Sequence, residues 1–572
     1  MRKWLLIGII AAAFLLRVVG LSNYPVGFTV DEASFGYDAY SLLETGKDQW
    51  GNSWPISLHS FGDFKLPIYT YLALPTVAIF GLNEFAVRLP GAIFGTLAVL
   101  FTYLVVVELF RNKLKRFKKD DIALLAALLL TISPWHILLS RGAFEANLTS
   151  FFIPLGLWAF YRGIAKPKWM LLAALSFGIN LFTYHSARLF TPLLVFGIVL
   201  IEKKRLLAKS SLKGVVGKHK GSIALFLFFL ILTTYTMFFG ASSRGLDVAI
   251  FNPTDNWRAV SERRYEAVLL DLPDPVSRAF SNKATYTARL FIHNLLTYTS
   301  PAFLFLQGAG EATYGMIPGI GVLYLVEIVF IMAALISFVR KPNRMIGFFL
   351  LWILVGFLPA SLSKGSGYSA NRAAVIMPAI QVVSAYGILV LIEYFKKKRL
   401  AFFSKKICQG AIAALLFISL VSFLENYIYH SPANVAPAMS YGWKETFNFV
   451  GGVENNYNNI VISRAFSEPQ ILVAFYSQID PSITQKESED WLRYQEKGLP
   501  FLDQLGEYYL GKYTFRDINF SVDQKLSNVL IIGKPREFPE DILPLKTIYY
   551  PNNKPAILIV DPSIQSYAEA DL

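Results

Sequence analysis

The sequence is short of charged residues and has almost no cysteine. Only 16% of its 572 residues are charged, whereas 54% are hydrophobic and the mean hydropathy is +0.43. A soluble globular protein carries about 25% charged residues, so this chain lacks the polar groups needed to cover a wholly water-exposed surface. Cys408 is the single cysteine, which excludes an intramolecular disulfide and a cysteine metal site.

Common nucleotide-binding and hydrolase motifs are also absent from the sequence. It contains no P-loop, no GxSxG, no HExxH and no zinc-ligand spacing. A cytosolic nucleotide-sugar donor is therefore not expected. The net charge is +14, but Lys and Arg occur in short clusters between apolar runs. Because a nucleic-acid-binding face would gather them on one soluble surface, nucleic acid is not expected as a partner.

Long apolar runs fill residues 1–424 and predict an α-helical polytopic membrane domain. A membrane-spanning helix needs about 20 mostly apolar residues, and the first run lacks a small-x-small cleavage site before Asn23, so we expect it to remain as an uncleaved helix. The eleven predicted spans are 4–21, 88–110, 122–139, 146–162, 169–184, 189–202, 222–240, 316–339, 345–362, 373–394 and 407–424.

The distribution of basic residues sets the expected orientation in the cell membrane. Loops assigned to the cytoplasmic side hold 27 Lys and Arg residues, whereas the short loops assigned to the outer side hold four. Because positive loops stay inside, the N-terminus is expected in the cytoplasm. Residues 67–82 are apolar but contain Pro75, and a span there would move the basic run 111–119 outside. We therefore expect 67–82 to form an interfacial or re-entrant helix.

Three segments are expected on the outer side of the membrane. They are a first loop (22–87), a second large loop (241–315) and a soluble α/β domain (425–572). In that domain YGWKETFNFV (441–450) predicts a helix. Short apolar runs bounded by turn residues predict strands, namely 458–464 (NNIVISR), 471–476 (ILVAFY), 528–533 (NVLIIG) and 556–561 (AILIVD).

Two adjacent acids, Asp31 and Glu32, follow the first predicted helix by about ten residues. A carboxylate at the membrane surface can act as a general base toward a hydroxyl group. Neighbouring residues on a helix point about 100° apart, so one acid can face a site while the other has a structural role. The alternative is purely structural, because Thr29 to Glu32 form a T-x-x-E capping box and first-turn acids also favour the positive end of a helix.

Isolated polar residues at the predicted outer ends of helices are the other candidates. Lys65 precedes the interfacial helix, where its cation could hold a lipid phosphate or snorkel to the surface. The remaining candidates could bind substrate, or act as interfacial anchors and local salt bridges; they are Arg141, Glu145, His185, Arg188 and Arg372. A divalent metal at the two acids would need further ligands, and none is evident, so no cofactor is expected.

The order of these features resembles the GT-C membrane glycosyltransferases. The likeness is closest to the bacterial members of the dolichyl-phosphate-mannose protein mannosyltransferase family and to the related lipid A aminoarabinose transferases. It covers roughly residues 1–400 and rests on four features, which are Asp31-Glu32, the Lys65-Leu66-Pro67 stretch leading into an aromatic helix, the run 81–105 and the segment NRAAVIMPAI (371–380).

The resemblance implies a polyprenyl-phosphate sugar as donor, bound where the lipid meets the outer aqueous phase. The acceptor would be a protein, lipid or glycan hydroxyl, and transfer of the hexose or pentose would invert the anomeric centre. By position, the resemblance implies that Asp31 is the catalytic base with Glu32 beside it in the site. It further implies that Lys65 and Arg372 hold the donor phosphate.

Two other functions fit parts of the pattern. A transporter or flippase of a lipid-linked or small polar substrate would also have many spans. Transporters place ionisable residues and broken helices at midmembrane, whereas the acids of this chain lie at the predicted outer edge. A scaffold that only anchors the terminal domain would tolerate substitution of those acids.

Overall fold

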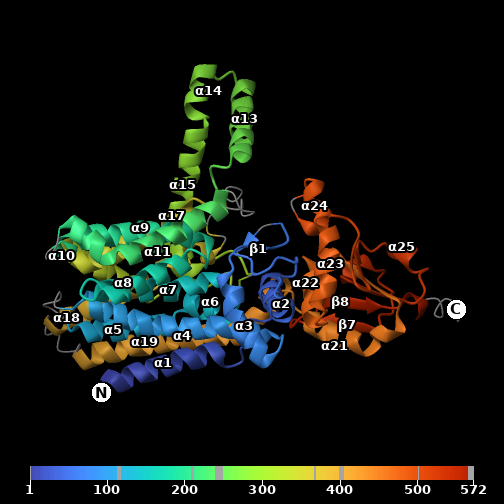
Figure 1. The fold of residues 1–572 in the computed structure, drawn as a ribbon, viewed down its shortest axis with the longest axis horizontal. Helices are drawn as coiled ribbons and strands as arrows, with labels where there is room; N and C mark the ends of the chain where they lie inside the picture. Colours follow the sequence, from blue (N-terminus) through green and yellow to red (C-terminus); the bar gives the residue numbers. More distant parts are fainter. Residues whose placement is uncertain are drawn as a thin grey trace.

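A bundle of long helices lies beside a separate sheet domain, and the N-terminus lies at the bundle end that is farthest from the sheet (Figure 1). The opposite end is called the sheet-domain end below. Parts of the predicted basic loops and the start of segment 241–315 lie outside the described residues. The computed structural model describes residues 2–62, 64–111, 117–207, 211–238, 249–312, 314–365, 367, 369–397, 405–499 and 501–564.

Helices occur at each of the predicted apolar runs. By length and composition, five described helices could cross a membrane, or six if the bent pair α5–α6 is one span. The predicted total of eleven spans stays a prediction, because the other helices are shorter. The bundle helices are α1 (Arg2–Val18), α4 (Glu84–Leu109), α5 (Lys119–Ile132), α7 (Thr149–Gly163), α8 (Pro167–Asn180), α9 (His185–Ile201), α11 (Leu212–Phe238), α16 (Glu327–Arg340), α17 (Arg344–Ser361), α18 (Ala379–Lys397) and α19 (Lys405–Glu425).

The predicted single helix 122–139 is wrong, because the chain bends by 57° between α5 and α6 (Pro134–Arg141). Proline lacks an N–H and clashes with the preceding turn, so carbonyls near the bend lose helical partners. Arg17 donates to the carbonyls of Leu130 (3.3 Å) and Thr131 (3.4 Å). The Tyr324 hydroxyl donates to the carbonyl of Ile132 at 2.6 Å.

Two further predicted helices begin later than expected. The run 316–339 becomes helical only at Glu327, because Pro318, Gly319 and Gly321 interrupt its first part. The run 373–394 starts as the 3₁₀ helix η3 (Ala370–Ile376), and α18 begins after Pro378. Both corrections have the same physical cause, since proline and glycine are poor in helix interiors.

The first outer loop is compactly folded next to the bundle. It contains α2 (Val30–Thr45), the antiparallel pair β1 (Leu58–His59) and β2 (Phe64–Lys65), and α3 (Ile68–Phe80). Helix α3 is the predicted helix of 67–82, and Pro75 lies inside it. It packs between α2 and α4, so the loop is built onto the bundle.

The terminal domain is a six-stranded mixed sheet in the order β4-β5-β3-β6-β8-β7. Strand β3 is parallel to both β5 and β6, while β4, β7 and β8 each pair antiparallel with a neighbour. The expected α/β domain is therefore confirmed. Its main elements are α21 (Trp443–Val453), β3 (Asn459–Ser463), α22 (Pro469–Tyr476), α23 (Pro481–Trp491), β4 (Tyr508–Leu510), β5 (Tyr513–Arg516), β6 (Val529–Gly533), β7 (Lys546–Tyr549) and β8 (Pro555–Val560).

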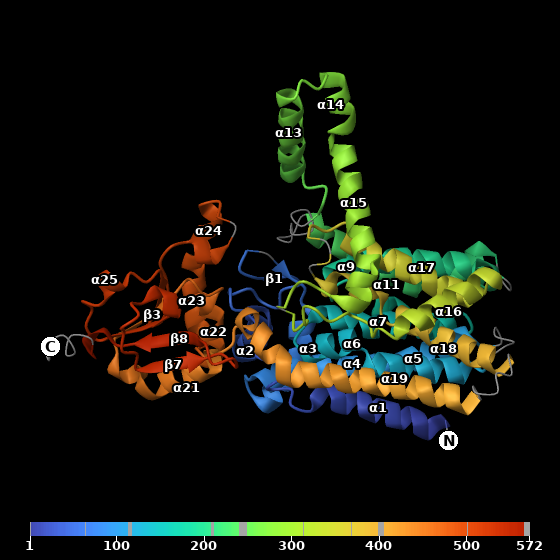
Figure 2. The ribbon, with the colours of Figure 1, turned by 180° about the vertical axis from the view of Figure 1, so that it is seen from behind.

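One of the four predicted strands is wrong. Residues 471–476 lie in helix α22, which begins at Pro469 and is buried along nearly its whole length. A short continuous apolar run cannot be separated by its period into a buried strand or a buried helix. Here Pro469 at the first helical position favours the helix, and α22 fills the space between the sheet and α2 (Figure 2).

The terminal domain holds the first outer loop through direct polar contacts. The Tyr37 hydroxyl donates to the carbonyl of Ile479 at 2.7 Å and hydrogen bonds with Thr484 at 2.7 Å. Lys444 pairs with the buried Glu84 at 3.0 Å. These contacts tie α2 and the start of α4 to the domain, so the position of α2 depends on both the bundle and the sheet domain.

A tight contact at Gly36 provides a test of this packing. A Cβ at Gly36 would lie 2.8 Å from Phe475 of α22 and closer still to Val87 of α4. We expect Gly36→Ala to destabilise the protein by about 1–3 kcal/mol through overpacking, measured as a lower thermal midpoint in detergent. Gly8→Ala is the control, because no atom lies within 4 Å of its Cβ position. Equal midpoints for the two variants would contradict the packing.

Candidate active site

Asp31 and Lys65 form an ion pair in the first outer loop. Asp31 lies in the first turn of α2, and its Oδ1 is 2.8 Å from Nζ of Lys65 in β2. The Lys65 side chain is 5% exposed and its ammonium lies over the rings of Phe35 (5.0 Å) and Phe61 (5.3 Å). The Asp31 side chain is 37% exposed. The lysine is therefore held in place by its surroundings, and the carboxylate is the accessible member of the pair.

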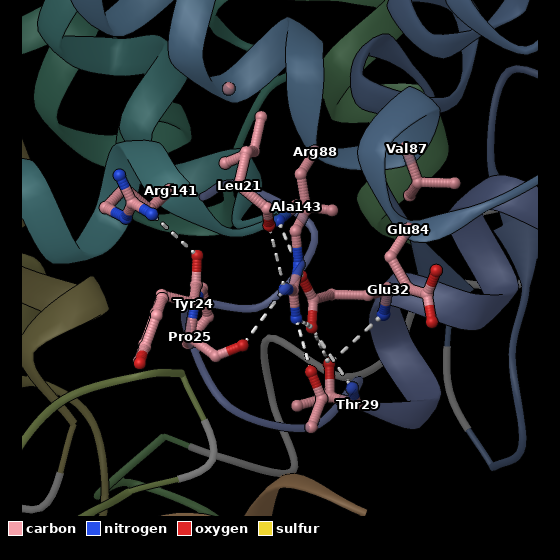
Figure 3. Close-up of polar contacts among 12 residues, drawn as sticks. Leu21, Tyr24, Pro25, Thr29, Glu32, Glu84, Val87, Arg88, Arg141 and Ala143 are labelled. Atoms are coloured by element: carbon pink, nitrogen blue, oxygen red, sulfur yellow. Dashed lines mark hydrogen bonds and ion pairs between the residues drawn. The ribbon is translucent and has the colours of Figure 1, made fainter. Parts of the chain in front are cut away.

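Glu32, the next residue, points the other way into a buried ion pair with Arg88 of α4 (Figure 3). Arg88 Nε donates to Oε1 at 2.8 Å and Nη2 donates to Oε2 at 3.1 Å, and both side chains are fully buried. The predicted capping box is present, since Thr29 Oγ1 accepts from the Glu32 N–H and Glu32 accepts from the Thr29 N–H. The contacts of Glu32 are therefore those expected if its role is structural.

The same ion pair joins several segments of the chain. Arg88 also donates to the carbonyls of Leu21 (3.2 Å), Pro25 (3.0 Å) and Gly27 (2.6 Å). Glu32 additionally accepts from the N–H of Ala143, just beyond α6, at 3.0 Å. The pair thus connects the chain after α1, the start of α2, α4 and the turn after α6.

Tyr314 lies near several charged groups, and Asp31 is one of them. Burial raises the pKa of Tyr314 well above its ordinary value, and the charges of Asp31, Glu311 and Glu145 raise it further. Tyr184, just before α9, acts on the same hydroxyl. Residues from four separate segments of the chain therefore lie near one another, and Asp31 and Glu145 are the two predicted residues among them.

A second acidic pair lies close to Lys65. Asp38 of α2 is almost fully buried and accepts from the N–H of Gln49 at 3.1 Å. Burial raises the pKa of Asp38, the charge of Asp48 raises it further and the charge of Lys65 lowers it. The Lys65 ammonium therefore lies near the charge of Asp38 as well as that of Asp31.

The other predicted residues have different surroundings. Arg141 is buried and donates to the carbonyls of Leu16 and Val19, both at 2.8 Å, so it closes the end of α1 as a structural contact. Arg188 donates to Thr236 of α11 at 3.3 Å. His185 starts α9, where its ring lies beside that of Tyr184.

Arg372 lies in η3, on the segment that joins α17 to α18. Its guanidinium donates to the carbonyls of Lys364 and Gly365. Its charge and a hydrogen bond also act on the Tyr298 hydroxyl, opposing the rise in the pKa of Tyr298 that burial causes. Tyr298 in turn donates to the carbonyl of Ser369 at 3.2 Å. Arg372 is therefore oriented by this loop and by Tyr298.

A cavity of about 560 Å³ lies between the chain after α1 and the terminal domain. Its lining combines aromatic rings with charged groups, among them Tyr24, Tyr441, Trp443, Glu84 and Lys444. Within the described residues, no group of three or more His, Cys, Asp or Glu side chains is arranged to hold a metal ion.

Sequence reasoning missed Arg88, Tyr298 and Tyr314. Arg88 is a single basic residue in an otherwise apolar helix, which is a signal for a buried polar contact. Its partner could not be identified, because Glu32 is 56 positions away. Tyr298 and Tyr314 stand among many tyrosines in polar segments and carry no comparable signal.

One known protein family matches part of the chain. Residues 65–233, less than half of the chain, match the family model described as dolichyl-phosphate-mannose-protein mannosyltransferase. The match begins at Lys65 and confirms the predicted resemblance to membrane glycosyltransferases over that range. No curated protein sequence matches the chain.

Three solved structures match the chain at low sequence identity. ArnT from Cupriavidus metallidurans bound to undecaprenyl phosphate is 13% identical, with 97% of each chain covered and a TM-score of 0.49. The oligosaccharyltransferase AglB from Archaeoglobus fulgidus is 14% identical, with 83% of this chain and 63% of that chain covered and a TM-score of 0.44. The Pmt1-Pmt2 protein O-mannosyltransferase complex from S. cerevisiae is 17% identical, with 43% and 35% covered and a TM-score of 0.32. Each TM-score lies below 0.5, so these likenesses carry no weight for the chemistry of the site.

Breaking the buried ion pair should unfold the first outer loop. Arg88→Met leaves the Glu32 carboxylate buried without its cation, which typically costs about 3–5 kcal/mol. We expect a large fall in the thermal midpoint of the purified protein. Arg258→Met is the matched control, because Arg258 is exposed and pairs along its own helix with Glu262, and such pairs contribute about 0.3–0.5 kcal/mol. A similar midpoint for both variants would refute this role of Arg88.

Proposed function

We propose that the chain is a membrane glycosyltransferase that moves a sugar from a polyprenyl-phosphate donor to an acceptor hydroxyl. Transfer would take place at the sheet-domain end, which the distribution of basic residues assigns to the extracytoplasmic side. The observation that carries the proposal is the pair of Asp31 and Lys65, an accessible carboxylate 2.8 Å from an immobilised ammonium. The family match, which starts at Lys65, supports the class of reaction.

Asp31 would be the general base of this reaction. The acceptor oxygen attacks the anomeric carbon, the bond from that carbon to the phosphate oxygen breaks, and Asp31 takes the hydroxyl proton. A single displacement of this kind inverts the anomeric centre. Polyprenyl phosphate leaves with the electron pair of the broken bond and carries its negative charge to the cationic side chains.

Lys65 and Arg372 would bind the leaving phosphate. Charge-assisted hydrogen bonds to an anion are about twice as strong as neutral ones. A guanidinium has five N–H donors, so Arg372 can keep its bonds to the loop carbonyls and still donate to a phosphate. A phosphate at Lys65 would share the ammonium with Asp31, weakening that ion pair and leaving the carboxylate freer to accept a proton.

Glu32 would act through position, without touching the reacting atoms. Both of its oxygens accept hydrogen bonds from Arg88 and from backbone N–H groups inside the protein. Its role would be to fix the first turn of α2, which directs Asp31 toward the site. Glu145 and Tyr314 would form the wall opposite Asp31.

Replacing the proposed base should stop transfer. A general base contributes about 10²–10⁴-fold to the rate, so we expect Asp31→Asn to lower kcat by that factor with little change in donor binding. The measurement follows label leaving a set of radiolabelled polyprenyl-phosphate sugars, with protein in nanodiscs. Asp541→Asn, on the surface of the terminal domain, is the control. Wild-type turnover in Asp31→Asn would remove this carboxylate from the mechanism.

Replacing Lys65 should affect binding of the lipid donor more than the turnover rate. A hydrogen bond to a charged group contributes about 1.5–3 kcal/mol, so Lys65→Met should raise the KM for the lipid donor by about 10- to 100-fold. Lys525→Met is the matched control, because Lys525 is exposed on the terminal domain. An unchanged KM with a well-folded Lys65→Met protein would exclude the phosphate role.

A further inference from the structure

Three helices leave the bundle together as an arm. They are α13 (Pro253–Leu269), α14 (Asp274–Phe280) and α15 (Lys283–Thr299). Figures 1 and 2 both show the arm projecting crosswise to the bundle helices, near the sheet-domain end. It belongs to the segment 241–315 that the sequence places outside the membrane.

Both roots of the arm are fixed to one end of α17. The N–H of Ile250 donates to the carbonyl of Leu362 at 3.0 Å, just beyond α17. At the other root, Asn294 of α15 donates to the carbonyls of Ser361 (3.0 Å) and Ser363 (2.8 Å). The arm therefore leaves the bundle at the level where a membrane-spanning helix ends.

The inside of the arm is held largely by polar contacts. Asn256 of α13 is buried and donates to Thr287 of α15 at 3.1 Å, so it lies between the two helices. Arg264 donates to the carbonyl of Ser281 at 2.8 Å, which joins α13 to the turn before α15. These bonds hold the three helices together as one unit.

The outside of the arm is rich in apolar side chains. Leu270 is 84% exposed at the tip and Phe280 is 74% exposed on α14. On α13, Trp257 and Tyr265 are exposed alongside charged residues such as Glu262. The exposed large apolar residues of the arm are Trp257, Tyr265, Val268, Leu269, Leu270, Leu272, Val276, Phe280, Ile292 and Leu296.

A water-soluble hairpin buries most of its large apolar residues, whereas this arm leaves them exposed beside its charged residues, Asp271 and Asp274 near the tip among them. Contiguous exposed apolar surface marks an interaction site, and Trp and Tyr are enriched where a membrane meets water. The bundle also exposes apolar side chains on α17, the helix against which α15 packs, namely Leu351 and Leu354.

We propose that the arm lies on the outer leaflet of the membrane and inserts its leucine tip at the boundary between headgroups and acyl chains. The inference rests on the outer-face orientation given under the proposed function. Arg289 is exposed on the same side of α15 as Ile292 and Leu296. Its long side chain can reach the headgroup phosphates while those two residues face the acyl chains.

The arm would set the height of the active site relative to the lipid. Helix α15 ends next to Tyr298, which bonds to the carbonyl of Ser369 and contacts Arg372. The chain then continues from α15 to Tyr314, whose pKa is raised by burial and by the nearby charge of Asp31. An arm seated on the lipid would therefore keep the phosphate-binding arginine level with the headgroups, where a polyprenyl-phosphate donor carries its sugar.

Fluorescent probes can test where the tip lies. Cys408 is the single cysteine, so a Cys408→Ser background allows a single NBD label at Leu270→Cys. The full chain is placed in nanodiscs of phosphatidylethanolamine and phosphatidylglycerol, one copy per disc. We expect blue-shifted emission and quenching by lipids with a nitroxide at acyl carbon 5, with little quenching by iodide. A label at Glu266→Cys, an exposed acidic position of α13, is the matched control and should be quenched by iodide.

A second variant distinguishes contact with lipid from contact between two copies of the chain. Leu269→Glu with Leu270→Glu changes only exposed side chains, and should move an NBD label at Phe280→Cys from lipid to iodide access while the thermal midpoint stays unchanged. Iodide quenching of the Leu270→Cys label equal to that of the control would overturn the proposal. Protection from both quenchers that appears only in discs with two copies would overturn it in favour of a contact between chains. Sugar transfer enters neither measurement, so failure of the proposed reaction would be seen separately.

Discussion

The buried ion pair between Glu32 and Arg88 is the interaction on which the outer part of the structure depends. A carboxylate removed from water is costly unless its charge and lone pairs are met, and Glu32 meets this requirement with Arg88 and two backbone N–H groups. Once that carboxylate is fixed inward, the helical repeat turns the preceding side chain by about 100°. Asp31 is thereby directed to the accessible side, within reach of Lys65.

The terminal domain adds a second constraint to the same helix. Its contacts through Tyr37 and Glu84 act on α2 and on the start of α4, the two helices that carry Glu32 and Arg88. The domain therefore braces the loop that presents Asp31. The backbone that carries an accessible carboxylate can thereby be held in place at the edge of a bundle, where a free loop would allow it to move.

Much of the fold could be predicted from the sequence, because local composition indicates where helices form: apolar runs mark the helices and basic stretches mark the loops between them. Helix breaks were harder to predict from the sequence. The bend at Pro134 depends on whether Arg17 and Tyr324 are available to donate hydrogen bonds to the carbonyls that lose their helical partners. In the site, the capping box of Glu32 was readable because it spans four residues. The ion pair of Glu32 with Arg88 and the proximity of Asp31 to Tyr314 could not be predicted, because these contacts join segments that are distant in the chain and depend on tertiary packing.

The two adjacent acids have opposite surroundings, and each meets a different requirement of the site. A base must be accessible and movable, whereas the backbone that carries it must be rigid. Glu32 supplies rigidity at the cost of its own reactivity, and Asp31, the ion-pair partner of Lys65, keeps an accessible side chain. The two acids Asp31 and Glu32 are therefore not interchangeable. If their environments were exchanged, the base would be buried and the first turn of α2 would lose its anchor.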